Sequence, residues 1–420
     1  MLGFLTKCAS VYGDIVPLRL GRNRVIFIND PTDIEHVLVT NAQNFTKSYI
    51  VRLLRPVLGN GLLISDGSFW RRQRRLVQPA FNHERISSYG NIMVTAANEM
   101  LSDWQDGETR DIHKEMMRVT SRIVAKSLFG AEITDDTQDI AHAVGVVMEN
   151  FSARRQSLFP IPLLVPTFSN LRLQRAIRAF DKIIYGFIDR RRESGKDHND
   201  LLSMLLQARD EDDGSGMTDK QLRDEALTLF LAGHETTANA LSWALYLISE
   251  HEKVETKLTA ELRSVVGPRL ARVEDLGSLR FTQRIILETM RLYPPAYILS
   301  RQAVRDFNLG DFRFPGGTIV LISQWVTHRQ TKYFENPNEF DPERWKDDLA
   351  KRLPRCAYFP FGMGPRSCIG ASFAMMEAVL LLAMVAQRFR LKILSEPKVE
   401  PWPSITLRPK FGISARLTKA

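Results

Sequence analysis

Residues 218 to about 250 contain no proline, and this uninterrupted run constrains the fold more than any other feature of the sequence. Its first residues, Thr218-Asp219-Lys220-Gln221, match a capping box, in which the side chains of Thr218 and Gln221 each bind the other's backbone N–H. A helix of this extent would be about 48 Å long at about 1.5 Å per residue, long enough to cross a protein of this size. The sequence therefore predicts one long central helix.

The middle of this helix carries a histidine and an acid in an otherwise apolar stretch, LFLAGHETTANALSW at residues 229–243. His234 followed by Glu235 can open a zinc-protease motif. That motif needs a second histidine four residues after the first, so that both face the metal from one side of the helix. Position 238 is Ala238, and the spacing therefore argues against a zinc protease.

Glu235 and Thr236 still need an explanation, because a buried carboxylate is costly unless it is paired or hydrogen-bonded. Thr236 can donate back to the carbonyl of Ala232, and Gly233 has no side chain, so the helix can bend or open locally. An opened turn would leave a polar notch for water or a diatomic ligand. The residues alone leave a second interpretation open, in which the acid and the threonines make ordinary helix hydrogen bonds.

Charge and cysteine content narrow the function classes. Lysine and arginine number 57 against 48 aspartates and glutamates, a net charge of +9, which is compatible with nucleic acid, an anionic membrane surface or an acidic protein partner. No recognisable nucleic-acid-binding module accompanies this charge, so no nucleic-acid partner is expected.

Cys8, Cys356 and Cys368 are an odd, sparse set, which argues against a disulfide framework and for a reducing compartment.

The longest apolar runs, such as AVLLLAMVA at residues 378–386, are shorter than the roughly 18 residues that a membrane-spanning helix needs. The first residues lack the apolar core and cleavage site of a signal peptide. The expected location is therefore cytoplasmic, with no membrane span in this chain. A trimmed N-terminal anchor is the open alternative.

Strand-like segments are few and lie near both ends. VPLRLGRNRVIFIND at residues 16–30 alternates and breaks at Gly21-Arg22-Asn23, which predicts a hairpin. FNLGDFRFPGGTIVLISQW at residues 307–325 carries a Pro-Gly-Gly turn, and SITLRPKFGISARL at residues 404–417 closes the chain. The rest of the sequence is predicted to be helical, and the polar stretch 209–216 is predicted to be a loop. The sequence predicts a mainly α fold with a small β part, in a single domain over residues 1–420.

A glycine-rich loop with a cysteine precedes a second apolar helical run, in YFPFGMGPRSCIGASFAMMEA at residues 358–378. Backbone amides at a helix N-terminus favour negative charge, so the Cys368 thiol would be held as thiolate, with Phe361 covering the sulfur and Arg366 adding a cation. A thiolate on a shielded loop suits haem iron. The alternative is a buried structural cysteine. Three glycines would let the loop approach a flat ligand without side-chain clash: Gly362, Gly364 and Gly370.

These motifs resemble those of the cytochrome P450 superfamily. FGMGPRSCIG matches its haem-binding loop, AGHETT its oxygen-activating helix, ETMR at residues 288–291 its E-x-x-R helix, FDPERW at 340–345 its meander, and WRRQRRLVQPAF from residue 70 its W-x-x-x-R helix. The motifs occur in the family's order and cover essentially the whole chain. The resemblance implies a helix-rich triangular prism with the long central helix over haem and minor β-sheets. It also implies a soluble, bacterial member of the AGHETT branch that includes fatty-acid hydroxylases.

The resemblance assigns roles to individual residues. Cys368 would be the axial thiolate ligand of haem b, and Glu235 and Thr236 would be the catalytic acid–alcohol pair that relays protons to dioxygen. Glu288, Arg291 and Arg344 would form a structural network rather than a catalytic group. The residues expected to bind the haem, several of them through its propionates, are Trp70, Arg74, Arg301, Phe361, Arg366, Cys368 and Gly370.

The implied reaction is monooxygenation, the insertion of one oxygen atom from O2 by hydroxylation or epoxidation. Two electrons, ultimately from NAD(P)H, would come from a separate ferredoxin, flavodoxin or reductase, because no fused reductase follows the haem domain. Two clusters of basic residues could dock an acidic donor: Arg71, Arg72 and Arg75, and Lys351, Arg352 and Arg355. The alternatives are a haem-thiolate isomerase or peroxygenase, and a non-enzymatic haem binder.

The segments that match the family's substrate pocket are apolar, which suits a fatty acid, terpenoid, steroid or polyketide-like compound. An apolar segment at residues 157–168 reads as a lid over the entrance. Arg52 or Arg55 could anchor a substrate carboxylate, although both also read as surface arginines. The expected pocket residues are Leu231, Ala232, Ala296, Tyr297, Ile298 and Ile405.

Overall fold

The fold is that of a computed structural model of residues 1–420, which describes all residues except 131–142, 148, 152, 155–160, 196–199 and 395. The chain divides into two compact units. Unit 1 comprises Met1–Phe45, His83–Thr120 and Glu235–Ala420, and unit 2 comprises Thr46–Asn82 and Ser121–His234. Two helices, α7 (Ile112–Phe129) and α11 (Asp219–Ser249), run from one unit into the other.

The long helix α11 begins and ends within a residue or so of its predicted bounds, and the capping box at its start is confirmed. Thr218 N–H donates to Gln221 Oε1 at 2.9 Å, and Gln221 N–H donates to Thr218 Oγ1 at 3.3 Å. The two side chains satisfy backbone donors that the first helical turn leaves unpaired. In unit 1, the Trp243 ring of α11 is fully buried, stacks on Tyr293 with centroids 4.1 Å apart, and donates its indole N–H to Leu407 O.

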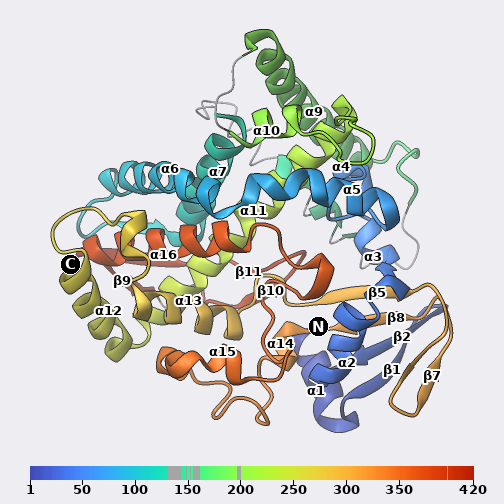
Figure 1. Cartoon of the computed structure of the whole chain (residues 1–420). Coiled ribbons are helices and arrows are strands. Elements are labelled where there is room, and N and C mark those ends of the chain that lie inside the picture. The colour runs from blue at the N-terminus through green and yellow to red at the C-terminus, as the bar shows by residue number, and fades with distance from the viewer. Residues whose placement is uncertain (131–142, 148, 152, 155–160, 196–199, 395) are drawn as a thin grey trace. The chain divides into compact units, whose positions relative to one another are not determined.

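The main sheet of unit 1 combines an N-terminal hairpin with strands from much later in the chain (Figure 1). β1 (Ile15–Leu20) and β2 (Asn23–Ile28) pair antiparallel across the turn Gly21-Arg22, as predicted, and Gly21 has the positive φ of 59° that this tight turn requires. β2 pairs parallel with β8 (Ile319–Ile322), which pairs antiparallel with β5 (Leu299–Ala303). The short strand β3 (Phe45–Lys47) spans the boundary between the units.

Both faces of this sheet are covered, which explains the continuous apolar run at the end of β2. On one face, Ile28 packs with Leu38 of the π-helix η1 (His36–Thr40). On the other face, Phe27 packs with Leu5 of α1 (Leu2–Tyr12). A strand buried on both faces has no polar alternation, in contrast to a strand at the surface.

Helix α16 (Ala371–Arg388) forms the centre of the helical part of unit 1. It contacts α6 (His83–Ser102), α12 (Glu252–Val265) and α13 (Arg280–Leu292), and Figure 1 shows α16 beside α6 and α13. Among the described helices, α16 alone is long and apolar enough to cross a membrane by length and composition. Because 56% of it is buried inside the protein, its packing in the core accounts for this composition.

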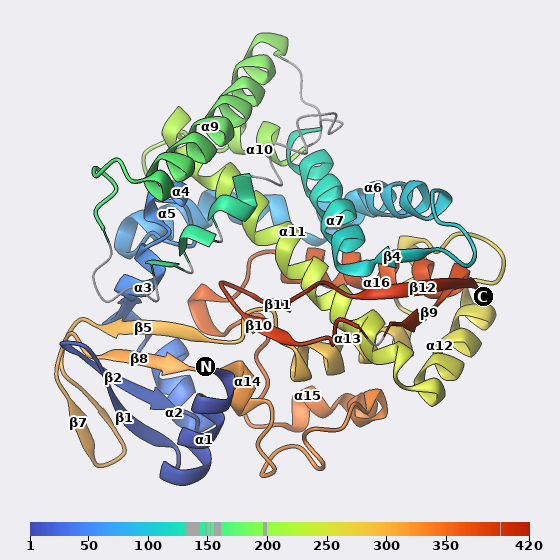
Figure 2. The ribbon, with the colours of Figure 1, turned by 180° about the vertical axis from the view of Figure 1, so that it is seen from behind.

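The remaining strands form small sheets (Figure 2). β4 (Thr109–Asp111), β12 (Ser414–Lys419) and β9 (Phe389–Ile393) form one sheet in that order, while β6 (Phe307–Leu309) pairs with β7 (Phe312–Phe314) and β10 (Pro401–Pro403) pairs with β11 (Leu407–Pro409). A mainly α fold with a small β part is therefore confirmed. The short helical elements of unit 1 are α2 (Pro31–Glu35), η2 (Ala42–Asn44), η4 (Val273–Asp275), α14 (Gln324–Thr327), η5 (Pro342–Asp348), α15 (Leu349–Arg352) and η6 (Gly364–Arg366).

Unit 2 is built around helices with clear sequence signals at their ends. α9 (Phe168–Ser194) starts after Thr167, whose hydroxyl oxygen accepts from Asn170 N–H at 3.2 Å, and ends at Gly195 in the left-handed conformation. α10 (Leu201–Gln207) starts after Asp200, whose carboxylate accepts from Ser203 N–H at 2.9 Å. The other elements are α3 (Tyr49–Arg52), α4 (Arg55–Leu58), α5 (Gly67–Val77) and η3 (Gln78–Phe81).

A carboxyl group of α11 is buried in unit 2. Glu225 has no exposed surface, and its Oε2 accepts from Leu62 N–H at 3.0 Å. Within the described part of the chain, Oε1 has no hydrogen-bond partner. Burial, with a smaller contribution from the neighbouring Asp224, raises the pKa of Glu225 to about 8. The folded protein therefore carries this group in its neutral form at physiological pH.

The free energy of unfolding is expected to fall with rising pH because of Glu225. The carboxyl keeps its proton up to about pH 8 in the folded protein but only to about pH 4.5 in the unfolded chain, so the folded state binds more protons in this window. The contribution of Glu225 to the free energy of unfolding is complete below about pH 4.5 and is lost as the pH rises toward about 8. Between these two pH values the free energy of unfolding falls by up to about 1.4 kcal/mol per pH unit. Urea unfolding at several pH values should show this slope in wild type and in the exposed control Glu211→Gln. Glu225→Gln should have a shallower slope, because Glu377, whose pKa is also raised by burial, keeps its own contribution, and an unchanged slope in Glu225→Gln would contradict the assignment.

Candidate active site

The loop that carries Cys368 is fixed in unit 1 by its backbone. Cys368 N–H donates to Phe361 O at 2.8 Å, which closes the loop just before α16, and Cys368 is exposed. Gly362 and Gly364 have positive φ values of 70° and 72°. A Cβ atom on Gly364 would lie 2.0 Å from the carbonyl oxygen of Leu38. The loop therefore requires glycine at position 364, and Cys368 lies on it as an exposed residue.

The other two cysteines lie in the core. Cys8 is buried with the α1 side of the main sheet, and Cys356 is buried on the opposite side. Burial raises the pKa of the Cys356 thiol to about 12, so this thiol is protonated at neutral pH. None of the three cysteines forms a disulfide. Cys368 is thus the one exposed cysteine.

Glu235 of α11 is buried and held by a residue far away in the sequence. Its side chain is 3% exposed, and its Oε1 accepts from Thr406 Oγ1 at 2.7 Å. Thr236, the next residue, is half-buried. The sequence predicted the acid–alcohol pair but not Thr406, for which the only signal was its place in an apolar segment near the C-terminus.

The residues predicted to bind propionates occur in both units. In unit 1, Arg301 on β5 is 7% exposed and donates to the carbonyl of Ser300, and Arg366 lies in η6 within the Cys368 loop. In unit 2, Trp70 and Arg74 lie one turn apart on α5, and Arg74 Nε donates to Gln78 Oε1 at 2.9 Å. Gly370 is the N-cap residue of α16.

Glu288, Arg291 and Arg344 meet in a buried cluster of unit 1. Glu288 and Arg291 side chains have no exposed surface and form two hydrogen bonds of 2.8 Å with each other. Arg344 Nε approaches Glu288 Oε1 at 3.3 Å, and the indole N–H of Trp345 donates to Oε2 at 2.8 Å. The remaining guanidinium hydrogens of Arg291 donate to backbone carbonyls of His328, Pro337 and Glu339. The single carboxylate thereby pairs with both guanidinium groups, and backbone carbonyls accept the remaining hydrogens of Arg291, so the buried charges are hydrogen-bonded.

This cluster also holds the start of the cysteine loop. The ring of Tyr358 lies 4.4 Å from that of Trp345, and its hydroxyl donates to Leu287 O at 2.8 Å. Phe359 N–H donates to His328 Nε2 at 3.0 Å. Burial and the nearby Arg291 lower the pKa of His328 well below its ordinary value, so the ring is neutral and can accept this hydrogen bond. The sequence contained Trp345, Tyr358 and His328 near the motifs, but gave no sign of these contacts.

The predicted pocket residues differ in their surroundings. Ala296, Ile298 and Ile405 of unit 1 are half-buried, while Leu231 is half-buried and Ala232 exposed in unit 2. Tyr297 is 1% exposed, packs in a core cluster and donates its hydroxyl to Ser404 O at 2.8 Å. The Tyr297 side chain thus packs in the core of this structure, and its place in the substrate pocket stays a prediction.

The apolar segment predicted as a lid is described only in part, because residues 157–160 lie outside the described residues. In the described part, Leu164 is 95% and Phe168 77% exposed. The segment therefore presents large apolar side chains at the surface of unit 2.

The basic residues predicted to dock an electron donor are largely neutralised. In unit 2, Arg75 binds Asp210 at 2.9 Å and Asp212 at 2.6 Å, and Arg72 also pairs with Asp210. The acidic loop 209–216 thus has a partner on α5, and two of the three arginines there are not free positive charges. In unit 1, Lys351 pairs with Asp348 and Arg355 pairs with Glu35.

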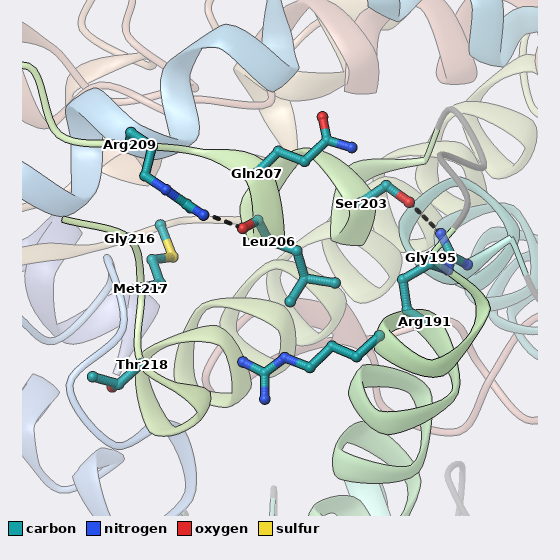
Figure 3. A pocket seen from close by; sticks show the side chains of 10 residues that line it. Arg191, Gly195, Ser203, Leu206, Gln207, Arg209, Gly216, Met217 and Thr218 are labelled. Carbon is teal, nitrogen blue, oxygen red and sulfur yellow. Dashed lines mark hydrogen bonds between the residues drawn. The ribbon is translucent and has the colours of Figure 1, made fainter. Parts of the chain in front are cut away.

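A polar cavity of about 480 Å³ lies in unit 2, between the end of α9, α10 and the chain leading into α11 (Figure 3). Arg191 donates to Ser203 there, and Arg209 donates to the backbone carbonyl of Leu206. A cavity of about 690 Å³ in unit 1 is bordered by Tyr293, Trp325 and neighbouring residues. Neither lining contains a predicted site residue, so neither cavity is the candidate active site.

The sequence matches the family model of cytochrome P450 over residues 1–414. The chain belongs to the cytochrome P450 family. It is similar to cyclooctatin synthase of Streptomyces melanosporofaciens, with 38% identity over 97% of this chain and 89% of that protein. It is also similar to cyclooctat-9-en-7-ol 5-monooxygenase of the same organism, with 36% identity over 93% of this chain and 85% of that protein. Among solved structures, retinoic acid bound cyanobacterial CYP120A1 matches with a TM-score of 0.88 and 26% identity, over 99% of this chain and 93% of that chain.

Membership in the cytochrome P450 family, with monooxygenases among the relatives, makes this chain a haem-thiolate monooxygenase that acts on apolar substrates. The cysteine loop fits such a cofactor, because Cys368 is the exposed cysteine and stands on a loop that begins with glycines of positive φ. Arg301 on β5, which is buried, and Arg366 in the loop, which is half-buried, suit the carboxylates that a haem carries. The cysteine and the two arginines are therefore the kinds of residue that a cytochrome P450 needs to hold its haem.

Proposed function

We propose that this cytochrome P450 binds haem b through the Cys368 thiolate and inserts one oxygen atom of O2 into a neutral terpenoid, by hydroxylation or epoxidation. The observation that carries the proposal is the exposure of Cys368 at the head of α16, while Cys8 and Cys356 are buried. A thiolate ligand donates electron density that favours O–O cleavage.

Six further residues would hold the haem in this proposal. Arg301, Arg366, Trp70 and Arg74 are donors suited to the propionate carboxylates. Phe361 and Gly370 flank the cysteine, and Phe361 already accepts the Cys368 N–H. When bound, the haem supplies the one-electron and dioxygen chemistry that amino-acid side chains lack. Glu288, Arg291 and Arg344 act structurally, because their contacts reach the loop through Trp345 and Tyr358.

The protein's own part in the reaction is proton delivery and exclusion of water. Thr236 and Glu235 are consecutive residues of α11, and a hydroxyl and a carboxyl group can hold and transfer protons. Glu235 is 3% exposed, so bulk solvent reaches it poorly and its protons must pass through ordered groups. This pair supports monooxygenation over a haem-thiolate isomerase or peroxygenase, which needs no delivered protons, and over a non-enzymatic haem binder.

A neutral terpenoid is favoured over a fatty acid by two observations. The monooxygenase relative is named for an olefinic alcohol, cyclooctat-9-en-7-ol, which carries no charge. Arg52, one of two arginines that could anchor a carboxylate, is paired with Asp66 at 3.3 Å within unit 2. A carboxylic acid is the second candidate class, because the structural relative CYP120A1 has retinoic acid bound. The half-buried apolar residues Ala296, Ile298 and Ile405 would line the pocket, together with Leu231 and Ala232.

The electron supply and location are also part of the proposal. We infer one haem-binding monooxygenase domain over residues 1–420 that works in the cytoplasm with a separate ferredoxin, flavodoxin or reductase, fed by NAD(P)H. The family model spans residues 1–414, which supports a single domain. Of the basic residues on α5, Arg71 is exposed and Arg72 and Arg75 pair with acids, so a docking surface there would rest on Arg71.

The proposed reaction is tested with 18O2. The haem-loaded protein, a surrogate ferredoxin and reductase, NADPH and a polycyclic terpene alcohol should give a product that contains one 18O atom. The same alcohol should shift the haem Soret band from low spin to high spin, while retinoic acid should shift it less. Product that forms without NADPH, or that carries no 18O, would contradict monooxygenation. A larger and tighter shift with retinoic acid would reject the neutral substrate but keep the reaction.

A further inference from the structure

The hydroxyl group of Thr406 is a hydrogen-bond partner of the Glu235 carboxyl group. Thr406 Oγ1 donates to Glu235 Oε1 at 2.7 Å across 171 positions of sequence. Glu235 is 3% and Thr406 7% exposed. A hydrogen bond is stronger in such buried surroundings than in water. One oxygen of the acid is thus fixed in direction.

A second side chain sets the direction of this hydroxyl. Asn239 lies four residues after Glu235, on the same side of α11, and its Nδ2 donates to Thr406 Oγ1 at 3.0 Å. Asn239 has no exposed surface. Because a threonine hydroxyl has a single hydrogen, accepting from Asn239 leaves that hydrogen for Glu235. The order Asn239, Thr406, Glu235 is therefore a directed chain of hydrogen bonds.

The turn that carries Thr406 is held in place from several sides. Residues 404–406 connect β10 to β11, and Ser404 N–H donates to Thr406 O at 3.1 Å inside the turn. Tyr297 donates its hydroxyl to Ser404 O at 2.8 Å, and Trp243 of α11 donates to Leu407 O at 3.0 Å. The Tyr297 side chain therefore supports this turn through its hydroxyl. The position of the Thr406 hydroxyl is therefore not left to a mobile loop.

We propose that Thr406 is the positioning residue of Glu235, so that the β10–β11 turn sets the orientation of the acid that relays protons. The role given to Glu235 rests on the proposed function, whereas the hydrogen bond itself does not. Ile405, next to Thr406, is one of the expected pocket residues. The same turn would thus contact the substrate and hold the acid, and a substrate that moves the turn would also move the carboxylate.

The contact is tested first without turnover. Thermal unfolding of the haem-loaded protein is measured for wild type, Thr406→Val, Glu235→Leu, which removes the acceptor, and the double variant. Thr406→Val keeps the shape of the side chain and removes the donor, so it should lower the melting temperature by several degrees. The two single changes should be non-additive, because both disrupt the same hydrogen bond. Additive shifts would overturn the proposal. Thr327→Val, at a buried threonine of α14 without a hydrogen-bond partner for its hydroxyl in the described structure, is the matched control and should change the temperature little.

The consequence for the reaction is tested second. Thr406→Val should lower the product formed per NADPH consumed by about tenfold, with hydrogen peroxide released instead, while the substrate dissociation constant changes less than about threefold. Thr406→Ser, which restores the hydroxyl, should recover most of the coupling. Unchanged coupling in Thr406→Val would overturn the proposal. Failure of the proposed function can be distinguished from failure of this inference. If the proposed function were wrong, wild type would give no oxygenated product, but the changes in melting temperature would still be non-additive.

Discussion

Replacing Cys368 with alanine is expected to reduce monooxygenase turnover to background, because no other cysteine can take its place. Cys8 and Cys356 are buried, and the Cys356 thiol is held protonated by its surroundings. Without the thiolate, the donor that favours O–O cleavage is lost. The measurement is product formation with NADPH and a surrogate electron donor, normalised to haem content.

The matched control is Cys356→Ala, which also removes one sulfhydryl group and lies only twelve positions earlier in the same segment. It should keep turnover within about twofold, because a small buried side chain contributes packing rather than chemistry. Turnover that survives in Cys368→Ala and disappears in Cys356→Ala would show that the ligand has been assigned to the wrong cysteine.

Glu288→Gln is expected to lower the free energy of unfolding by about 3–5 kcal/mol, since it leaves the Arg291 charge buried without a compensating carboxylate. Arg291 and Glu288 have no exposed surface, and Arg344 and Trp345 bind the same carboxylate. Urea unfolding followed by far-UV circular dichroism measures the change. The variant should also hold haem less tightly, because the cluster supports Tyr358 and Phe359 at the start of the cysteine loop.

Two variants separate this buried cluster from ordinary surface charge. Glu343→Gln removes a carboxylate that pairs with Lys257 and Lys346, both more than half exposed, and should cost no more than about 1 kcal/mol. Trp345→Phe removes one hydrogen bond to Glu288 and should cost about 1.5–3 kcal/mol. If Glu288→Gln and Glu343→Gln had equal effects, the cluster would not have the structural role given to it.

The parts of the fold that depend on neighbouring residues could be predicted from the sequence. The capping box of α11 follows from residues three apart, and the β1–β2 turn follows from Gly21-Arg22 between two strand-like runs. The pairing of Glu288 with Arg291 follows from their spacing on one helix. In each case the two partners lie within a few positions of each other, so a local pattern contains the whole interaction.

The interactions that shape the site join segments that the sequence does not connect. Thr406 reaches Glu235 across 171 positions, and no local pattern marks a threonine in an apolar C-terminal segment as its donor. Arg75 meets Asp210 across 135 positions, so a basic cluster that read as a docking surface is half neutralised. Tyr297 matched a pocket-lining segment, but its side chain turns into the core. Register and side-chain direction within such a segment depend on the tertiary contacts that cover it.

The most direct test of the account is the absorption spectrum of the dithionite-reduced, haem-loaded protein under carbon monoxide. Wild type should show the strongly red-shifted Soret band of a thiolate-ligated haem, and Cys368→Ala should lose that band while Cys356→Ala keeps it. A wild-type band at the position of a histidine-ligated haem, or no haem bound at all, would contradict the assignment of Cys368 as the axial ligand and with it the proposed reaction.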